Sequence, residues 1–155
     1  SVIFQKTTNE ELGGPDIHGA ISGVSDMTAE NDKDCIERTR LLLSYLPNNC
    51  TQQPPRRTPT DDPKRLSEKL LKIIPAEPRR AYDMHKVIAD IVDNGEFFEI
   101  KKEFATNLIT GFARFDGGPV GIVANNPLVR AGSLDVDAAD KGARFVRICD
   151  AFNVP

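Results

Sequence analysis

The 155-residue chain carries 20 Lys and Arg against 23 Asp and Glu, a formal net charge of -3, and its length allows one ordinary domain or two partial ones. It has no basic block and no run near the roughly 18 apolar residues of a membrane span, which disfavours nucleic acid binding and membrane insertion. Cys35, Cys50 and Cys149 are odd in number and form no CxxC pair, which indicates reduced thiols, no structural metal, and a location in the cytoplasm or, in a eukaryote, the mitochondrial matrix.

The two ends of the chain indicate a piece of a longer polypeptide. There is no initiator Met, residues Val2–Phe4 read as a strand already under way, and an apolar segment begins where the chain stops at Phe152–Pro155. Because some partner strands would then be missing, we expect the piece to be marginally stable alone.

Residues 32–46 are predicted to form an amphipathic helix, because half-apolar and apolar positions step by three and four residues. Asn31 or Thr28 would cap its start, and Pro47 follows its end. The positions expected to face inward are Ile36, Thr39, Leu43 and Leu46.

Residues 47–81 are predicted to be a linker. Five prolines lie between Pro47 and Pro63 among Asn, Gln, Arg and Asp residues, a composition that cannot supply a core and favours extended polyproline geometry. The alternative is a long surface loop inside one domain, which is uncommon in compact domains. The linker divides the chain into the end of one domain, residues 1–46, and the start of a second, residues 82–155.

The second part is predicted to begin with a helix over residues 82–93 that stops at Asn94-Gly95. A further helical stretch is expected from Glu103 to Leu108. The inward positions of the first of these helices are Met84, Val87, Ile88, Ile91 and Val92.

A hairpin and a helix are predicted to follow. Residues 109–115 and 120–125 read as two strands joined by a turn at Asp116–Gly118, and Pro119 belongs at a strand start or edge because it has no N–H for a ladder. Residues 138–152 read as a helix, so the fold class is α/β with a β-β-α unit that leads toward a further strand. The inward positions of this helix are Phe145, Ile148, Cys149 and Phe152.

The first candidate site is the glycine-rich segment 11–24, which holds four glycines in eleven residues. Backbone N–H groups beside glycine can stabilise an oxyanion, but tight turns account for most such glycines and are the favoured interpretation. His18 has a pKa suited to a general base. It has no obvious Ser, Cys or carboxylate partner in the sequence, which favours a structural or hydrogen-bonding histidine.

The second candidate site is the segment Ala131–Asp135, between the hairpin and the last helix, where loops often form sites. Its N–H groups could bind a developing enolate or ureido oxygen. Equally, it could be a connection in which Asp135 or Asp137 caps the helix. On that helix Lys141, Arg144 and Arg147 could contact phosphate, although a solvated face is the ordinary explanation.

A series of motifs along nearly the whole chain resembles the carboxyltransferase subunits of biotin-dependent acyl-CoA carboxylases, of the propionyl-CoA carboxylase beta type. It spans the join between the two halves of those subunits. The motifs are Leu12-Gly13-Gly14, His18, Ser22-Gly23-Val24, Glu30-Asn31-Asp32, Tyr45-Leu46-Pro47, Ile74-Pro75-Ala76-Glu77-Pro78, Tyr82-Asp83-Met84, Phe97-Phe98-Glu99-Ile100, Gly111-Phe112-Ala113-Arg114, Val120-Gly121-Ile122-Val123-Ala124-Asn125-Asn126-Pro127, Ala131-Gly132-Ser133-Leu134-Asp135, Lys141-Gly142-Ala143-Arg144-Phe145-Val146-Arg147 and Cys149-Asp150-Ala151-Phe152-Asn153-Val154-Pro155.

The resemblance implies a partial crotonase-like β-β-α superhelix, the end of one half and the start of the next. It also implies transfer of carboxyl from carboxybiotin to the α-carbon of an acyl-CoA such as propionyl-CoA. Biotin, carried on a partner, brings the reactive carboxyl, so backbone amides that stabilise oxyanions are needed and a side-chain nucleophile is not. The implied partners are biotin carboxylase and biotin carrier subunits, with the subunit itself assembled as a dimer of trimers.

By position, the resemblance makes Ala131, Gly132 and Ser133 the biotin-side loop. It places Gly13, Gly14, His18, Ser22 and Gly23 at the edge of the CoA-side cleft. The glycine-rich oxyanion segments of the family fall outside this chain, so we expect the fragment alone to be inactive. Two alternatives stay open: the same subunit in a biotin-dependent decarboxylase or transcarboxylase, and a crotonase-like scaffold without catalysis.

Overall fold

The computed structural model describes residues 7–77 and 80–155, so the strand predicted at Val2–Phe4 lies outside the described residues. An antiparallel sheet has the order β1 (Phe98–Ile100), β2 (Leu108–Phe115), β3 (Gly118–Asn125). The helical elements are α1 (Asn9–Gly13), η1 (Ile17–Ile21), α2 (Asp32–Leu43), α3 (Leu70–Ile73), α4 (Met84–Ile91), η2 (Asp93–Gly95), η3 (Arg130–Gly132) and α5 (Val136–Ala151). None of the helices within the described ranges is long and apolar enough to cross a membrane.

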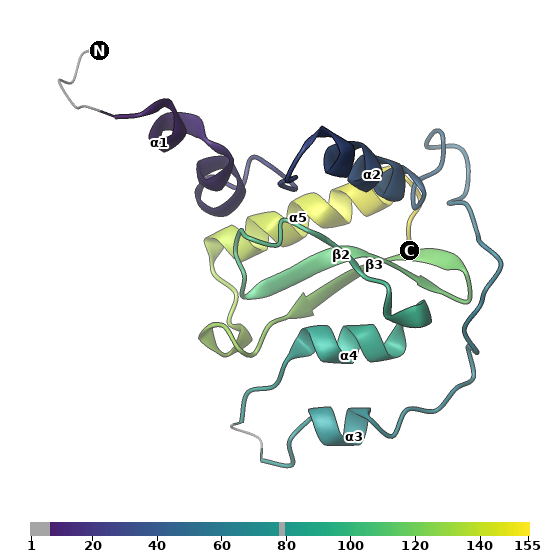
Figure 1. The fold of residues 1–155 in the computed structure, drawn as a ribbon. Helices are drawn as coiled ribbons and strands as arrows, with labels where there is room; N and C mark the ends of the chain where they lie inside the picture. The colour runs from purple at the N-terminus through teal and green to yellow at the C-terminus, as the bar shows by residue number, and fades with distance from the viewer. Residues whose placement is uncertain (1–6, 78–79) are drawn as a thin grey trace.

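The elements form layers about the sheet (Figure 1). Helices α2 and α5 cover one face, α4 covers the other, and α3 lies outside α4. Strand β2 is therefore enclosed on both faces and is buried along all but its last residue. Because side chains alternate along a strand, β2 supplies Phe112 to the face under α5, and Ile109 and Ala113 to the face under α4.

The predicted hairpin is confirmed. Phe115 pairs with Gly118, which leaves a two-residue turn of Asp116 and Gly117 with φ values of 49° and 74°. Both lie in the left-handed region that the favoured hairpin turns require. The Asp93 carboxylate accepts hydrogen bonds from the N–H groups of Asp116, at 3.0 Å, and Gly117, at 2.7 Å. The turn is thus anchored from outside as well as by its own residues.

Replacing Gly117 with Ala is expected to reduce the stability of the hairpin by about 2 kcal/mol. A Cβ at this left-handed position would lie 2.0 Å from the carbonyl oxygen of Arg57. Gly118→Ala is the matched control, because Gly118 has no positive φ and its nearest atom belongs to the flexible end of the Arg56 side chain. Hydrogen exchange of the hairpin amides measures both; equal protection in the two variants would contradict the prediction.

The last helix is also confirmed, as α5. The Asp135 side chain accepts a hydrogen bond from the Ala138 N–H at 3.0 Å, which is the helix-capping role predicted as one alternative. Phe145 and Cys149 are buried on the inward face. Beyond the helix the chain returns to the sheet, where the Gly121 N–H of β3 donates to the Pro155 carbonyl oxygen at 2.7 Å.

Helix α4 is shorter than predicted, and one of its inward positions was wrong. Ile88 and Val92 are buried, but Ile91 is 43% exposed. The helix ends at Ile91, so Val92 turns inward with an extended backbone, ψ 160°, instead of following the helical period. The predicted stop at Asn94-Gly95 is therefore late; these two residues have positive φ values of 53° and 70° and belong to the short 3-10 helix η2.

The helix predicted from Glu103 to Leu108 is wrong, and the short strand β1 before it was not predicted. Residues 101–107 form turns, with Lys101 and Ala105 at positive φ. The carbonyl oxygens of Phe104 and Leu108 accept hydrogen bonds from the Lys141 ammonium of α5, at 2.8 and 2.6 Å. These carbonyl groups therefore accept hydrogen bonds from a distant side chain instead of from the backbone N–H groups of a helix.

Helix α2 is capped by Asn31, one of the two predicted candidates. Of its predicted inward positions, Ile36, Thr39 and Leu43 were wrong, whereas Leu46 packs against the core. Ile36 and Leu43 are 52% and 61% exposed. The helix contacts the core through its C-terminal end, where Leu42 and Leu46 pack beside the buried Tyr45. The insertion of Tyr45 sets the rotation of the helix, and a spacing pattern alone does not contain that information.

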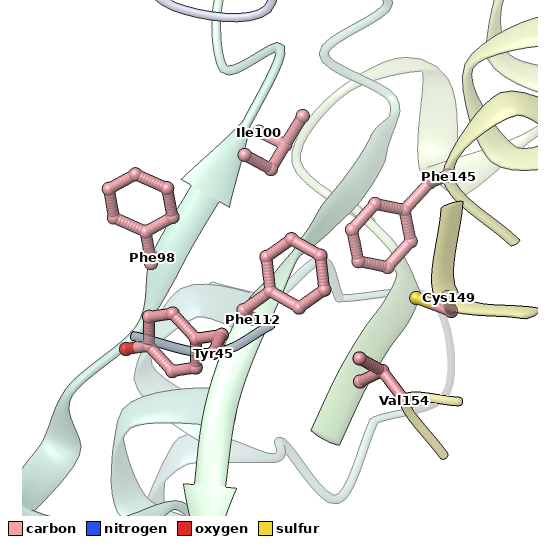
Figure 2. Close-up of a cluster of buried hydrophobic side chains, with 7 residues drawn as sticks. All are labelled: Tyr45, Phe98, Ile100, Phe112, Phe145, Cys149 and Val154. Carbon is pink, nitrogen blue, oxygen red and sulfur yellow. The ribbon is translucent and has the colours of Figure 1, made fainter. Parts of the chain in front are cut away.

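The larger core cluster joins the first and second parts of the chain (Figure 2). The ring of Phe112 lies with its centroid 5.7 Å from that of Tyr45 and 5.0 Å from that of Phe145. Tyr45 comes from before the proline-rich segment, and the other two come after it. The cluster consists of Tyr45, Phe98, Ile100, Phe112, Phe145, Cys149 and Val154.

Residues 47–69 contain no helix or strand and run along the outside of the sheet, after which the unpredicted α3 packs on α4. The segment is tied down at intervals. The Arg57 N–H donates to the Gly117 carbonyl at 2.9 Å. Asp61 accepts from the Asn94 N–H at 2.9 Å, and Arg65 donates to the Val92 carbonyl at 3.1 Å. The boundaries of the three predicted parts stay a prediction.

Candidate functional site

The predicted biotin-side residues Ala131, Gly132 and Ser133 lie in a loop between β3 and α5, here called loop 130–133. Its first three residues have consecutive positive φ values, 49° at Arg130, 54° at Ala131 and 73° at Gly132. Only Gly adopts this conformation without strain. Two non-glycine residues held there in succession are a local strain of the kind found at functional sites.

Asparagine side chains from neighbouring elements hold loop 130–133 in place. Asn125 Nδ2, at the end of β3, donates to the Gly132 carbonyl oxygen at 2.5 Å. Asn107 Nδ2 donates to the Ser133 carbonyl oxygen at 2.7 Å, and Asn107 is 3% exposed. An ion pair between Arg130 and Asp135 closes the loop onto the start of α5. These bonds compensate for the strain of the left-handed residues.

The loop presents only small side chains at residues 131–133. Ala131 and Ser133 are exposed while Gly132 is buried. The N–H groups of Gly132 and Ser133 donate within the turn, to the carbonyls of Val129 at 2.9 Å and Arg130 at 3.1 Å. An oxyanion would have to displace these bonds or use the N–H of Ala131.

Replacing Asn125 with Ala is expected to reduce the local stability of loop 130–133 by about 1 to 2 kcal/mol, because the Gly132 carbonyl loses its donor. Hydrogen exchange of the loop amides in the intact protein measures the change. Asn153→Ala is the matched control, since Asn153 Nδ2 donates to the Cys50 carbonyl at 2.7 Å, far from the loop in the sequence. Unchanged loop protection in Asn125→Ala would show that the loop does not depend on this bond.

Two buried lysines lie beside the candidate elements. Lys101 and Lys141 are 5% and 2% exposed. The Lys101 ammonium contacts the Gly23 carbonyl and the Asp26 carboxylate, the latter at 2.9 Å, and so ties the glycine-rich segment to the sheet. The solvated basic face predicted for α5 is therefore wrong for Lys141, although Arg144 is exposed.

The burial of Lys141 had a signal in the sequence. Ala138, Lys141 and Phe145 are spaced three and four residues apart, so they share one face of α5, and the outer two are buried. The side chain reaches the carbonyls of the 101–108 turn from that face. Burial lowers the pKa of Lys141 to about 8, against an attraction from Glu99 that raises it.

The glycine-rich segment is mostly helical. Gly13 ends α1 and Gly14 caps it, with φ -69° at Gly14, so the predicted tight-turn role is wrong for these two residues. A Cβ at Gly14 would lie 2.7 Å from the Glu10 carbonyl oxygen. Gly23 does have a positive φ, 60°, and the ring of Phe104 packs where a Cβ would stand. The absence of a side chain at Gly14 and Gly23 permits the close approach of Glu10 and Phe104.

His18 has a partner that the sequence did not reveal. In η1 its Nδ1 lies 3.3 Å from Ser22 Oγ, one turn along the helix, and both residues are exposed. Among residues 7–77 and 80–155 no carboxylate lies within ion-pair distance of His18. The pair can offer hydrogen bonds to a ligand, and it lacks the third group that would orient a general base.

The two candidate sets lie beside different features of the structure. A cleft of about 310 Å³ adjoins the glycine-rich segment and is lined by Gly19, residues 25–30, Arg38, Glu99 and residues 101–103. Loop 130–133 is not part of its lining. Within the described chain, no hydrogen bond links residues 13–23 to residues 131–133. The two sets therefore lie apart in this part of the chain.

The whole chain, residues 1–155, matches the carboxyl transferase domain family. It is 46% identical to the propionyl-CoA carboxylase, carboxyltransferase subunit, of Haloferax mediterranei and 50% identical to the methylmalonyl-CoA decarboxylase subunit alpha of Veillonella parvula. Both matches cover 100% of this chain and 30% of the relative. The solved transcarboxylase 12S, a hexamer and multienzyme core with hydrolysed methylmalonyl-coenzyme A bound, has a TM-score of 0.95 at 44% identity, over 99% of this chain and 30% of that one.

Proposed function

The chain belongs to the carboxyl transferase domain family, and from that membership we propose that the intact protein transfers a carboxyl group from carboxybiotin to the α-carbon of an acyl-CoA. The proposed substrate is propionyl-CoA and the product methylmalonyl-CoA. The observation that carries the proposal is the unbroken match of the chain, at 46% identity, to a propionyl-CoA carboxylase carboxyltransferase subunit. The α/β arrangement is part of a crotonase-like fold.

We assign the biotin side to Ala131, Gly132 and Ser133. The small, exposed side chains of Ala131 and Ser133 suit the close approach of a flat bicyclic ring, and this observation supports the fit. Biotin, bound to a carrier subunit, supplies the activated carboxyl group. The role of the loop is to position that group and to offer backbone hydrogen bonds, while Asn125 and Asn107 keep the loop in shape.

We assign the CoA side to the exposed edge formed by Gly13, Gly14, His18, Ser22 and Gly23. His18 and Ser22 supply polar atoms there, and the ion pair of Lys101 with Asp26 fixes the segment next to the sheet. The solved transcarboxylase 12S is a hexamer assembly. This likeness supports a homo-oligomer, which we propose to be a dimer of trimers.

The proposed partners are biotin carboxylase and biotin carrier subunits, in the cytoplasm or the mitochondrial matrix. The proposed parts of the chain are residues 1–46 on the acyl-CoA side, the linker 47–81, and residues 82–155 on the biotin side. Since the chain is 30% of the length of its relatives, the isolated piece is expected to be inactive.

A second candidate function is the same subunit in a biotin-dependent decarboxylase. It is favoured by the 50% identity to a methylmalonyl-CoA decarboxylase subunit alpha. The transferred group and both carriers are the same in the two proposals, and only the direction differs. A transcarboxylase role rests in the same way on the likeness to transcarboxylase 12S.

The test is transfer of labelled carboxyl by the intact protein with its biotin carrier, from carboxybiotin to propionyl-, acetyl- and methylcrotonyl-CoA. Preferential label in methylmalonyl-CoA is the expected result. Net transfer from methylmalonyl-CoA to biotin would favour the decarboxylase, and no transfer in either direction would leave a non-catalytic scaffold.

A matched pair of variants tests the biotin-side assignment in the same assay. Ala131→Asp places a carboxylate on the exposed loop and is expected to abolish transfer, while acyl-CoA binding is unchanged. Ala143→Asp makes the same substitution at an exposed position of α5 and should retain activity. Equal activity of the two variants would contradict the assignment.

A further inference from the structure

A second cleft lies at the hairpin end of the sheet, away from loop 130–133. Its volume is about 210 Å³. Arg114 of β2 forms its buried side and is 5% exposed. The lining also includes Tyr45, Arg57, Thr58, Pro59, Thr60, Asp93, Asn94, Glu96 and Gly117. The first segment, the predicted linker and the sheet all meet at this point.

The Arg114 guanidinium is held firmly but is only partly paired. Its Cζ lies 4.0 Å above the centroid of the Tyr45 ring, and its Nη2 donates to the Ser44 carbonyl at 2.8 Å and to Ser44 Oγ at 3.0 Å. Nε and Nη1 are buried and have no hydrogen-bond partner within the described parts of the chain. A buried charged donor without an acceptor is unfavourable and needs an explanation.

The rest of the cleft is rich in donors. Arg57 brings a second cation, and the Thr58 and Thr60 hydroxyls lie on the same segment. Burial raises the pKa of Tyr45, so its hydroxyl stays protonated and can donate. Burial lowers the pKa of Arg114 from its usual value, and the charge of Arg57 lowers it further, although Tyr45 acts in the other direction. An anion between the two arginines would stabilise both charges.

The acidic residues of the cleft do not act as acceptors for the Arg114 guanidinium. The Asp93 carboxylate already accepts the N–H groups of Asp116 and Gly117. Glu96 is exposed, and within the described ranges it forms no ion pair with either arginine. The unpaired donors of Arg114 therefore have no carboxylate acceptor among these side chains.

We propose that this cleft binds a small oxyanion, either a phosphate group or a carboxylate, between Arg114 and Arg57. Arginine is the side chain best suited to such groups because its N–H donors are planar and permanently charged. The volume is below the 300 to 1,000 Å³ typical of sites for drug-sized ligands, which favours a single ionic group over a nucleotide.

Binding has a structural consequence. Arg57 and Thr58 belong to the segment that crosses the outside of the sheet, and that segment contacts the hairpin through the Arg57 N–H and the Gly117 carbonyl. An anion shared by Arg57 and Arg114 would add a second link between this segment and β2. Occupancy should therefore protect the amides of residues 57–61 from hydrogen exchange.

The experiment titrates the intact protein with inorganic phosphate at constant ionic strength maintained with chloride, and follows binding by calorimetry and by exchange of the 57–61 amides. The test variant is Arg57→Gln, on an exposed segment where folding should not suffer. Arg56→Gln is the matched control. It removes the same charge from the adjacent residue, whose guanidinium pairs with Asp116 at 3.2 Å and does not line the cleft.

The expected result is saturable phosphate binding with protection of residues 57–61, weakened about ten-fold by Arg57→Gln, as for the loss of one charge-assisted hydrogen bond, and changed less than two-fold by Arg56→Gln. Arg114→Lys, which keeps the charge but loses the guanidinium donors, should also weaken binding. Displacement of phosphate by acetate would indicate a carboxylate ligand, and its failure a phosphate. No saturable binding, or equal weakening by Arg56→Gln and Arg57→Gln, would overturn the proposal.

Discussion

Replacing Phe112 with Ala is expected to lower the free energy of unfolding by about 4 kcal/mol. Phe112 is 1% exposed, and its ring packs against Tyr45 from the first part of the chain and Phe145 from α5. Truncation would leave a cavity where three segments meet. Urea denaturation of the intact protein, followed by the amide exchange of β2, measures the change.

Phe115→Ala is the matched control for this prediction. It removes the same side chain from the same strand, but Phe115 is 40% exposed and belongs to neither buried core cluster. Its expected effect is below about 1.5 kcal/mol. Similar losses in the two variants would mean that the cluster around Phe112 does not join the two parts of the chain in solution.

Replacing Lys141 with Met is expected to reduce stability by about 3 kcal/mol. The side chain is 2% exposed, and its ammonium donates to the carbonyls of Phe104 and Leu108. Methionine fills similar space but leaves these buried acceptors unpaired, and each such loss costs about 1 to 3 kcal/mol. Arg147→Met, on the exposed side of the same helix, should change stability by less than about 0.5 kcal/mol.

The same variant has a predicted pH dependence. Burial lowers the pKa of Lys141 from its ordinary 10.5 to about 8 in the folded protein. Between these two values the unfolded chain binds more protons than the folded one, so rising pH favours the folded state. The stability advantage of the wild type over Lys141→Met should therefore be constant below pH 8 and should grow from pH 8 to pH 10. An advantage that shrinks over this range would contradict a lowered pKa.

Several elements could be predicted because their signals are local. The Asp116-Gly117 turn between two apolar runs predicted the hairpin, and the apolar period after Ala138 predicted α5, with Asp135 as one of two candidate caps. Turn type and capping depend on a few adjacent residues, so the sequence contains them in full. The motifs also predicted the family, which the match over residues 1–155 confirms.

The candidate site could be predicted only in part from such local signals in the sequence. The position of loop 130–133 between β3 and α5 followed from the order of elements. Its left-handed backbone and its bonds to Asn125 and Asn107 did not, because Asn107 precedes β2 and reaches the loop only once β2 has paired with β3. The pairing of His18 with Ser22 depends on the unusual helical turn η1, which residue spacing did not predict.

The sequence by itself determined the hairpin turn, the α/β class and the family, since each depends on neighbouring residues or on the order of motifs. The tertiary structure alone decided which face of α2 is buried and that residues 101–108 are not helical. In each case a contact between distant residues, such as Tyr45 with Phe112 or Lys141 with the Leu108 carbonyl, outweighs the local preference. The free energy of burying and pairing a group exceeds the small differences in local propensity that a sequence pattern reflects.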